Sequence, residues 1–164
     1  MAESFRVFKF SINKAFIPAF IGHLRSDDKQ KHPEAEAFAS FSKNQNASKK
    51  SGPFFLELVN GILDTRVEID ALIERFSKNW KIRRMSCVDR NVMRIAVYEL
   101  LYCGDIPPKV SINEAVDVGK KFGSEDSGAF INGIMDSIRE ALVKEGTLKK
   151  LDANFDRDQE QIRE

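Results

Sequence analysis

Helix start signals in the second half of this chain constrain its fold more than any other feature. Ser86-Cys87-Val88-Asp89 has the form of a capping box, and Ser111-Ile112-Asn113-Glu114 has the same form 25 residues later. In such a box the hydroxyl accepts a hydrogen bond from a free backbone N–H, and the carboxylate reaches back to the capping residue. The two motifs therefore predict two successive helices.

Helix stop signals follow each of these starts. Gly104 and Gly123 stand where a helix would end in the left-handed conformation, which favours a residue without Cβ. Pro107-Pro108 excludes helix between the first two elements, because proline lacks the N–H that a helix interior needs. Together with the starts, these signals predict helices over 87–103, 112–122 and 128–143.

The preceding segment continues the helical pattern. Pro53 suits the first turn of a helix, where its missing N–H has no cost. From there, apolar side chains recur at helical spacing on one face. The members of this stripe are Phe54, Phe55, Leu58, Ile62, Leu63, Ile69, Leu72, Ile73, Phe76 and Trp80.

The N-terminal third is less regular. Residues 5–24 place phenylalanines at helical spacing but also alternate as a strand would, and Pro18 interrupts them. We favour a broken helix that packs its aromatic stripe into the domain. Residues 25–52 are polar, with at most a short helix around 33–42, and read as a loop. With no competing strand pattern or repeat, the prediction is an all-α fold.

Composition excludes several classes of protein. A length of 164 residues corresponds to one ordinary domain, and 42% hydrophobic residues suffice for a packed core. The charged content of 31% and the interrupted apolar N-terminus argue against a membrane protein or a signal peptide, so we expect a cytoplasmic location. The formal net charge of +1 gives no global basic excess that would indicate nucleic-acid binding.

Neither a metal site nor a catalytic site is evident. Cys87 and Cys103 lie about 24 Å apart on one predicted helix, beyond disulfide reach, and read as free thiols. No phosphate-binding glycine loop, HExxH motif or Ser/His/Asp set is present. Asp70 and Glu74 read as an i,i+4 pair on a solvent-facing helix surface. We therefore predict a protein that is not an enzyme and uses no cofactor.

Basic residues form two groups. Arg83 and Arg84 belong to the first, with Arg75, Lys78 and Lys81 before them and Arg90 and Arg94 on one face of the next helix. The second group comprises Lys109, Lys120 and Lys121. Runs of this kind more often form a solvated face, or complement helix C-termini, than bind phosphate.

The turn Gly123–Gly128 separates the last two predicted helices. Ser124, Asp126 or Ser127 can cap the second of them, and its free N–H groups could also face a phosphate. Phe130 follows shortly after and reads either as a core residue or as an exposed ring that stacks on a base. The pattern alone favours the core.

Several stretches resemble the NusB family of bacterial transcription antitermination factors. They are VDRNVMRIAVYEL, GDIPPKVSINEAV and KKFGSEDSGAFINGIMD, with a weaker collinear match through PFFLELVNGILDTRVEIDALIERFSKNW. The resemblance implies an all-helical fold of two small packed bundles and no enzymatic activity. It also implies binding of single-stranded boxA RNA from ribosomal-operon transcripts, together with ribosomal protein NusE, in a complex that modifies RNA polymerase.

The resemblance also assigns roles to individual positions. Asp126 and Phe130 fall in the part that borders RNA in the family, and Asp89 of the VDR motif falls on the side that meets NusE. We add Lys109, Lys120 and Lys121 to the predicted RNA contacts. Arg83 and Arg84 are added to the predicted partner contacts.

The chain departs from the family at its N-terminus. Family members begin with an arginine-rich helix of the form RxxARExAxQxLY that contacts phosphates, whereas this chain has SFRVFKFSINKAF. Arg6, Lys9 and Lys14 are the nearest substitutes. We therefore expect one domain over 1–164: a divergent helix and polar loop (1–52), central helices (53–85), a C-terminal bundle (86–143) and a charged tail (144–164).

Two other hypotheses remain open. The altered N-terminus favours a NusB-like protein-interaction module that has lost direct RNA binding. NusB-like domains also precede the catalytic domain of certain ribosomal-RNA cytosine methyltransferases, but this chain carries no such domain after its helices, and we expect no methyl-donor binding. Some relatives form dimers that would cover an RNA surface, and the sequence does not decide between a monomer and a homodimer.

Overall fold

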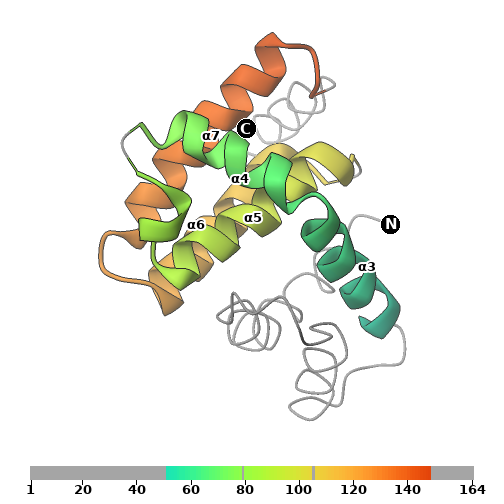
Figure 1. The fold of residues 1–164 in the computed structure, drawn as a ribbon, viewed down its shortest axis with the longest axis horizontal. Coiled ribbons are helices and arrows are strands. Elements are labelled where there is room, and N and C mark those ends of the chain that lie inside the picture. The colour runs from blue at the N-terminus through green and yellow to red at the C-terminus, as the bar shows by residue number, and fades with distance from the viewer. Residues whose placement is uncertain (1–50, 79, 105, 149–164) are drawn as a thin grey trace, which may run out of the picture. The chain divides into compact units, whose positions relative to one another are not determined.

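The structure of the protein, a computed structural model, describes residues 51–78, 80–104 and 106–148, with side chains from Glu57 onward (Figure 1). The interpretation of residues 5–24 lies outside this part, as do residues 25–50 of the predicted loop 25–52 and the end of the charged tail from residue 149. The predicted contacts Arg6, Lys9 and Lys14 also lie outside it. The loop prediction is wrong for its last two residues, because the helix begins at Ser51, two residues before Pro53.

The described residues form helices and no strand, which confirms the predicted all-α fold. Contacts within the chain divide it into two compact units, residues 1–65 and 66–164. The elements are α3 (Ser51–Asp64) in the first unit, and α4 (Arg66–Phe76), the 3-10 helix η1 (Ile82–Arg84), α5 (Cys87–Tyr102), α6 (Pro108–Phe122) and α7 (Ser127–Lys144) in the second.

Helix α3 shows the amphipathic pattern that the sequence predicts for this stretch. Leu58, Val59 and Ile62 are buried and lie on one face at helical spacing. After the helix ends at Asp64, the Thr65 hydroxyl donates a hydrogen bond of 2.6 Å to the carbonyl of Gly61, which satisfies one of the last free carbonyl groups.

The core of the second unit lies between α4, α5, α6 and α7. Helix α6 packs between its chain neighbours α5 and α7, and α4 lies against both α5 and α7 (Figure 1). The largest fully buried side chains of this unit come from α4, α5 and α7. They are Ile69, Ile73, Met93, Val97, Ile131, Met135 and Ile138.

Of the two capping boxes that the sequence predicts, one starts a helix in the structure and the other does not. Ser86 caps α5, because its Oγ accepts a hydrogen bond from the Asp89 N–H at 3.0 Å. The second predicted box is wrong: α6 begins at Pro108, and Ser111 lies buried in its first turn. The reason is that a proline at the first helical position loses no hydrogen bond, so the helix starts earlier than a serine cap would place it.

The predicted left-handed helix ends are also wrong. Among the described residues only Lys78 and Gly146 have positive φ, at 46° and 73°. Gly123 ends α6 with φ −93° and ψ −159°. This position still needs glycine, for a different reason: a Cβ there would lie 2.6 Å from the Cβ of Ser127. Close approach, and not backbone conformation, excludes a side chain at Gly123.

An ion pair joins α4 to α5 inside the second unit. Arg94 is 2% exposed. Its Nε and Nη2 donate to Oδ1 and Oδ2 of Asp70 at 2.6 and 2.7 Å, and Nη1 donates to Asn91 Oδ1 at 2.8 Å. The prediction that Asp70 lies on a solvent-facing surface is therefore wrong. A carboxylate that neutralises a buried guanidinium is part of the core.

Glu74 also has a structural role that the sequence did not indicate. Its Oε1 accepts a hydrogen bond of 2.8 Å from the Ile82 N–H, at the start of η1. This hydrogen bond lowers the pKa of Glu74 from its ordinary value of 4.5, with a smaller contribution from Lys81. Glu74 thus ties the end of the α4 segment to η1.

Within the described residues no helix is long and apolar enough to cross a membrane.

Candidate nucleic-acid interface

The turn between α6 and α7 is closed by one serine. Ser127 Oγ accepts a hydrogen bond from the Ser124 N–H at 2.8 Å and lies 3.1 Å from Ser124 Oγ. The expected side-chain cap of α7 is not formed at its N-cap position, because the N–H that Ser127 bonds belongs to Ser124 in the turn and not to the helix. Asp126 precedes α7, is exposed and makes no capping hydrogen bond with its side chain. Its carboxylate therefore stands at the surface of the turn.

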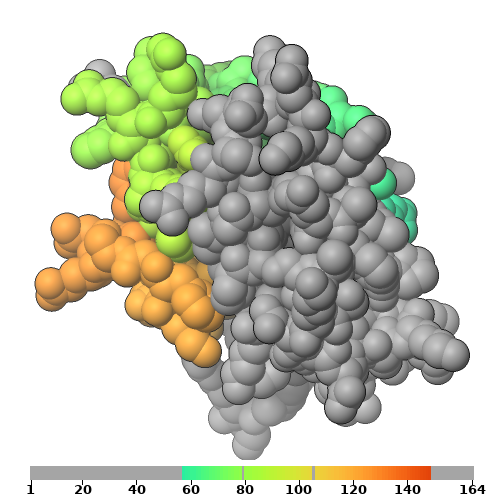
Figure 2. Space-filling model, turned by 60° about the horizontal axis from the view of Figure 1, so that its bottom comes forward, coloured from blue at the N-terminus to red at the C-terminus, as the bar shows by residue number. Residues whose placement is uncertain are grey.

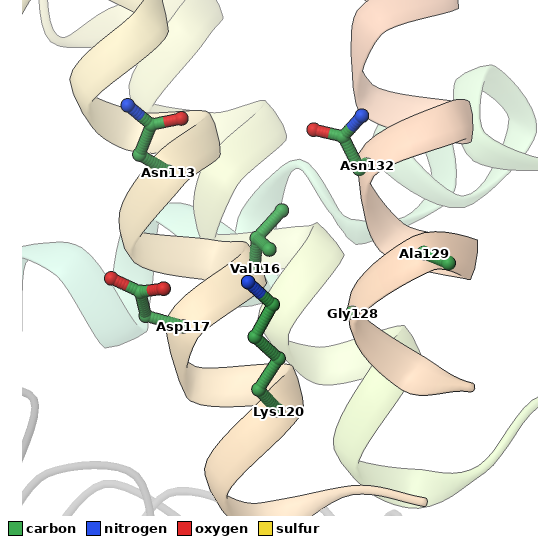
Figure 3. Close-up of a pocket in the computed structure, with 7 residues that line it drawn as sticks. All are labelled: Asn113, Val116, Asp117, Lys120, Gly128, Ala129 and Asn132. Atoms are coloured by element: carbon green, nitrogen blue, oxygen red, sulfur yellow. The ribbon is translucent and has the colours of Figure 1, made fainter. Parts of the chain in front are cut away.

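A shallow groove of about 620 Å³ runs between α6 and α7 beside this turn (Figure 3). Helix α6 contributes Lys120 to it, and the amide side chains of Asn113 and Asn132 lie on its two sides (Figure 3). The complete lining is Asn113, Val116, Asp117, Lys120, Gly128, Ala129 and Asn132. Amides, an amine and a carboxylate provide hydrogen-bond donors and acceptors for a polar ligand.

Gly128 determines where the Lys120 side chain lies. A Cβ at Gly128 would be 2.7 Å from Cγ of Lys120, so the lysine stem occupies the space that a side chain on α7 would fill. The stem thus crosses the first turn of α7, and the amine lies at the groove (Figure 3). Sequence reasoning selected Lys120 but missed Asn113 and Asn132. The signal was the polar stripe Asn113, Asp117 and Lys120, which recurs at helical spacing on α6.

Phe130 lies two residues beyond Gly128, so its side chain leaves α7 in a different direction from the groove. It is half-buried and meets Trp80 edge to face, with ring centroids 5.9 Å apart and an interplanar angle of 69°. Trp80 is 53% exposed. The core interpretation of Phe130 therefore holds only in part, because one of its neighbours is a ring at the surface.

Trp80 does not continue the apolar stripe of the preceding helix, as the sequence pattern predicted. Helix α4 ends at Phe76, and the positive φ of Lys78 turns the chain away from the helix axis. Helical spacing counted past this point no longer describes one face. The contact between Trp80 and Phe130 joins residues 50 positions apart, and no local pattern indicates it.

The second basic group is only partly brought together. Lys120 and Lys121 are exposed in the last turn of α6, and Lys121 Nζ lies 5.1 Å from the centroid of the Phe122 ring. Lys109 is half-buried in the first turn of the same helix. A separation of eleven residues corresponds to about 16 Å along the helix axis. Lys109 is therefore distant from the α6–α7 turn.

The first basic group divides into paired and exposed members. Arg75 pairs with Glu145 and Lys81 with Glu74, each at 3.4 Å and largely in solvent. Arg83 and Arg84 are exposed in η1. The sequence pattern placed Arg94 on one helix face with Arg90. In the structure Arg94 is buried and bonded to Asp70, so it is not available to a phosphate.

Polar atoms without partners mark the first turn of α5. Asp89 is buried, with 7% of its surface exposed. Its Oδ1 is also buried, yet it has no hydrogen-bond partner in the described part of the chain. The Nε of Arg90 is likewise buried without a hydrogen-bond partner among the described residues. Buried polar atoms of native proteins nearly always have partners, so each such atom requires an explanation.

Comparison with known proteins supplies the family. The sequence model of the NusB family matches residues 19–140. This chain belongs to the NusB family. The match starts well upstream of Pro53, so part of the divergent segment 1–52 falls within it, whereas Arg6, Lys9 and Lys14 precede it.

Relatives and solved structures agree with this membership. The transcription antitermination protein NusB of Desulfatibacillum aliphaticivorans is 52% identical over 123 residues, which cover 75% of this chain and 86% of the relative. The structure of T. maritima NusB matches with a TM-score of 0.70 and 34% identity, over 80% of this chain and 90% of that one. A crystal structure of antitermination factors NusB and NusE in complex with dsRNA matches with a TM-score of 0.67 and 27% identity, over 79% and 96%. NusB proteins are transcription factors, which confirms the prediction that the chain is not an enzyme.

Proposed function

We propose that this protein is an RNA-binding transcription antitermination factor. In this proposal it acts with ribosomal protein NusE on boxA-type RNA of ribosomal-operon transcripts, within the RNA polymerase antitermination complex in the cytoplasm. The observation that carries the proposal is the α6–α7 turn, where a polar groove and a partly exposed aromatic pair flank one helix start. Single-stranded RNA is recognised by such combinations of hydrogen-bonding groups and stacking rings.

The RNA surface in this proposal is centred on α7. Lys120 and Lys121 supply positive charge for phosphates, and the Asn113 and Asn132 amides offer donors and acceptors for base edges. Asp126 and Phe130 border the strand on the turn and on the aromatic side. Lys109 is reached only by a strand that runs along α6. Arg6, Lys9 and Lys14 would add contacts from the segment outside the described residues.

The partner surface in this proposal is the first turn of α5 with η1. Asp89 belongs to this surface through the family resemblance alone, because the residue is 7% exposed and its unpaired Oδ1 is buried rather than open to a partner. Arg83 and Arg84 lie exposed shortly before it in the chain. A related structure of antitermination factors NusB and NusE in complex with dsRNA supports NusE and RNA as the two partners.

A fluorescence-anisotropy titration of labelled boxA-type RNA, with and without NusE at two salt concentrations, tests the proposal. We expect binding that tightens with NusE and weakens with salt, because phosphate contacts release counterions. A scrambled RNA of equal length serves as the control. No binding in any condition, by a protein shown to be helical, would reject direct RNA recognition.

The second candidate is a protein-interaction module without RNA binding. The divergent N-terminus favours it, since SFRVFKFSINKAF stands where the family has an arginine-rich helix that contacts phosphates. The titration separates the two candidates. Binding to NusE that Asp89→Asn weakens, without any RNA signal, would support the module.

A further inference from the structure

Trp80 is exposed although it belongs to the residue type with the largest apolar surface. Among the described residues, the exposed large apolar side chains are Val67, Trp80, Tyr102 and Val143. Of these, Trp80 forms a ring contact with Phe130, a residue of the proposed RNA surface. Leaving so large an apolar side chain in water is unfavourable, and a large exposed aromatic beside a binding surface is typical of a contact residue.

The backbone of Trp80 is held before any ligand binds. Its N–H donates to the Ser77 carbonyl at 3.2 Å, and its carbonyl accepts from the Ser77 hydroxyl at 2.6 Å. Ser77 itself is buried. Between them, Lys78 adopts φ 46°, a region that side chains with a Cβ rarely occupy. The backbone that carries the ring is thus held by Ser77, so this segment loses less conformational entropy on binding than a free loop would.

The contact with Phe130 leaves ring surface available. An edge-to-face pair at 69° uses the edge of one ring and one face of the other, so flat apolar surface remains open. Nucleobases stack on such faces irrespective of their identity. Two adjacent rings in different planes could contact two neighbouring bases of a strand that changes direction at the turn.

The charged residues around Trp80 indicate which class of ligand fits this aromatic pair. Residues 75–84 contain five basic residues, of which Arg75 and Lys81 pair with Glu145 and Glu74. The other three, Lys78, Arg83 and Arg84, are exposed. Figure 2 shows the segment after α4 and the α6–α7 turn side by side on one face of the molecule. An aromatic pair bordered by cations fits a polyanion with stacking groups better than it fits an apolar peptide.

We infer that Trp80 and Phe130 form a two-ring stacking platform for unpaired bases of single-stranded RNA, and that Trp80 contributes to RNA affinity. The inference rests on the proposed function and deepens it. It adds to the site a residue that neither local spacing nor the family resemblance indicated.

The chain offers its own probe for the test, because Trp80 is its one tryptophan. The full-length protein is titrated with unlabelled boxA-type RNA while tryptophan emission is recorded, and in parallel with labelled RNA while anisotropy is recorded. We expect emission to be quenched in proportion to the bound fraction. An RNA of the same length with abasic sites keeps its phosphates but cannot stack, so it should bind weakly and leave the emission unchanged.

Substitutions complete the test. Trp80→Ala should weaken RNA binding about tenfold, within the range of one base–aromatic stack, and Trp80→Phe should retain most of the affinity. Val67→Ala, which removes an exposed apolar side chain of α4, is the matched control and should bind as the unsubstituted chain does. Circular dichroism verifies that each variant is folded.

The outcomes separate the inference from the proposed function. RNA binding by anisotropy with unchanged emission, or with an unchanged affinity of Trp80→Ala, would overturn the platform and leave the proposed function intact. No anisotropy change with any RNA, in the presence or absence of NusE, would overturn both. Quenching with a tenfold loss for Trp80→Ala and none for Val67→Ala would establish the platform.

Discussion

Arg94 and Lys120 show how differently two helical cations are used in this chain. Arg94 is buried between α4 and α5, with Asp70 and Asn91 bonded to its guanidinium. Lys120 lies at an open groove, with its stem over Gly128. The difference is a carboxylate delivered by another helix. A cation that meets such a partner becomes part of the core, and a cation that does not is available to a ligand.

The largest expected effect is on the buried side of this comparison. Arg94→Ala removes the buried member of the pair and leaves the half-buried Asp70 carboxylate with Arg66 alone, whose Nε lies 3.7 Å from it. We expect a loss of about 3 kcal/mol in the free energy of unfolding, the low end of the range for a broken buried pair. Urea denaturation followed by circular dichroism measures it, with Lys120→Ala as the exposed control. A loss below about 1 kcal/mol for Arg94→Ala would remove the distinction between the two cations.

The open side is tested by the double substitution Lys120→Ala with Lys121→Ala. We expect RNA affinity to fall about tenfold and the slope of log affinity against log salt to decrease by about 1.4, because each phosphate contact to a single strand contributes about 0.7. Stability should change by less than about 0.5 kcal/mol. Anisotropy titrations across a salt series provide the measurement, and an unchanged slope would mean that neither lysine contacts phosphate.

Gly128→Ala sharpens the comparison within the groove. The new Cβ meets Cγ of Lys120 and forces the lysine stem off the first turn of α7. We expect a loss of RNA affinity of about threefold, equivalent to about 0.6 kcal/mol, with little change in stability because a flexible stem can move. Gly133→Ala, where a Cβ meets no atom within 4 Å, is the matched control on the same helix. Equal RNA affinities of the two variants would show that the position of the Lys120 stem over Gly128 does not affect RNA binding.

The smallest expected effect concerns Glu74, a half-buried carboxylate that is bonded to a backbone N–H. The pKa of Glu74 in the folded protein is lowered below 4.5 by the Ile82 N–H. A carboxyl group with a lowered folded pKa contributes stability above its unfolded pKa and loses it as the pH falls through the folded pKa. The unsubstituted chain should therefore exceed Glu74→Gln in stability near pH 7, and the two should converge below pH 4.5. Thermal unfolding across pH 3–7 measures this, and a constant difference would exclude the linkage.

Local signals predicted the parts of the fold that local physics determines. Helices α5 and α7 lie within one residue of the predicted ranges, because a serine cap and a polar turn bound them. The start of α6 was missed since Pro108 is itself a good first residue, and the sequence pattern treated it as an exclusion. Gly123 was selected correctly as a required glycine, but for the wrong physical reason.

Features that depend on distant residues could not be predicted in this way. Asp70 and Arg94 are 24 positions apart, and Trp80 and Phe130 are 50 apart, so no spacing rule joins them. The candidate site was therefore found through the family resemblance and through single residues. Its groove and its second ring became apparent only from the packing of α6 and α4 against α7.

The Asp70–Arg94 bond has a consequence for how this protein can vary. Because replacing Asp70 alone leaves the buried Arg94 guanidinium without its carboxylate, position 70 can change only together with position 94, or through an intermediate of low stability. We expect them to co-vary among members of the family. A chimera that exchanges α4 between two relatives must therefore carry the matching residue on α5, however similar the two helices otherwise are.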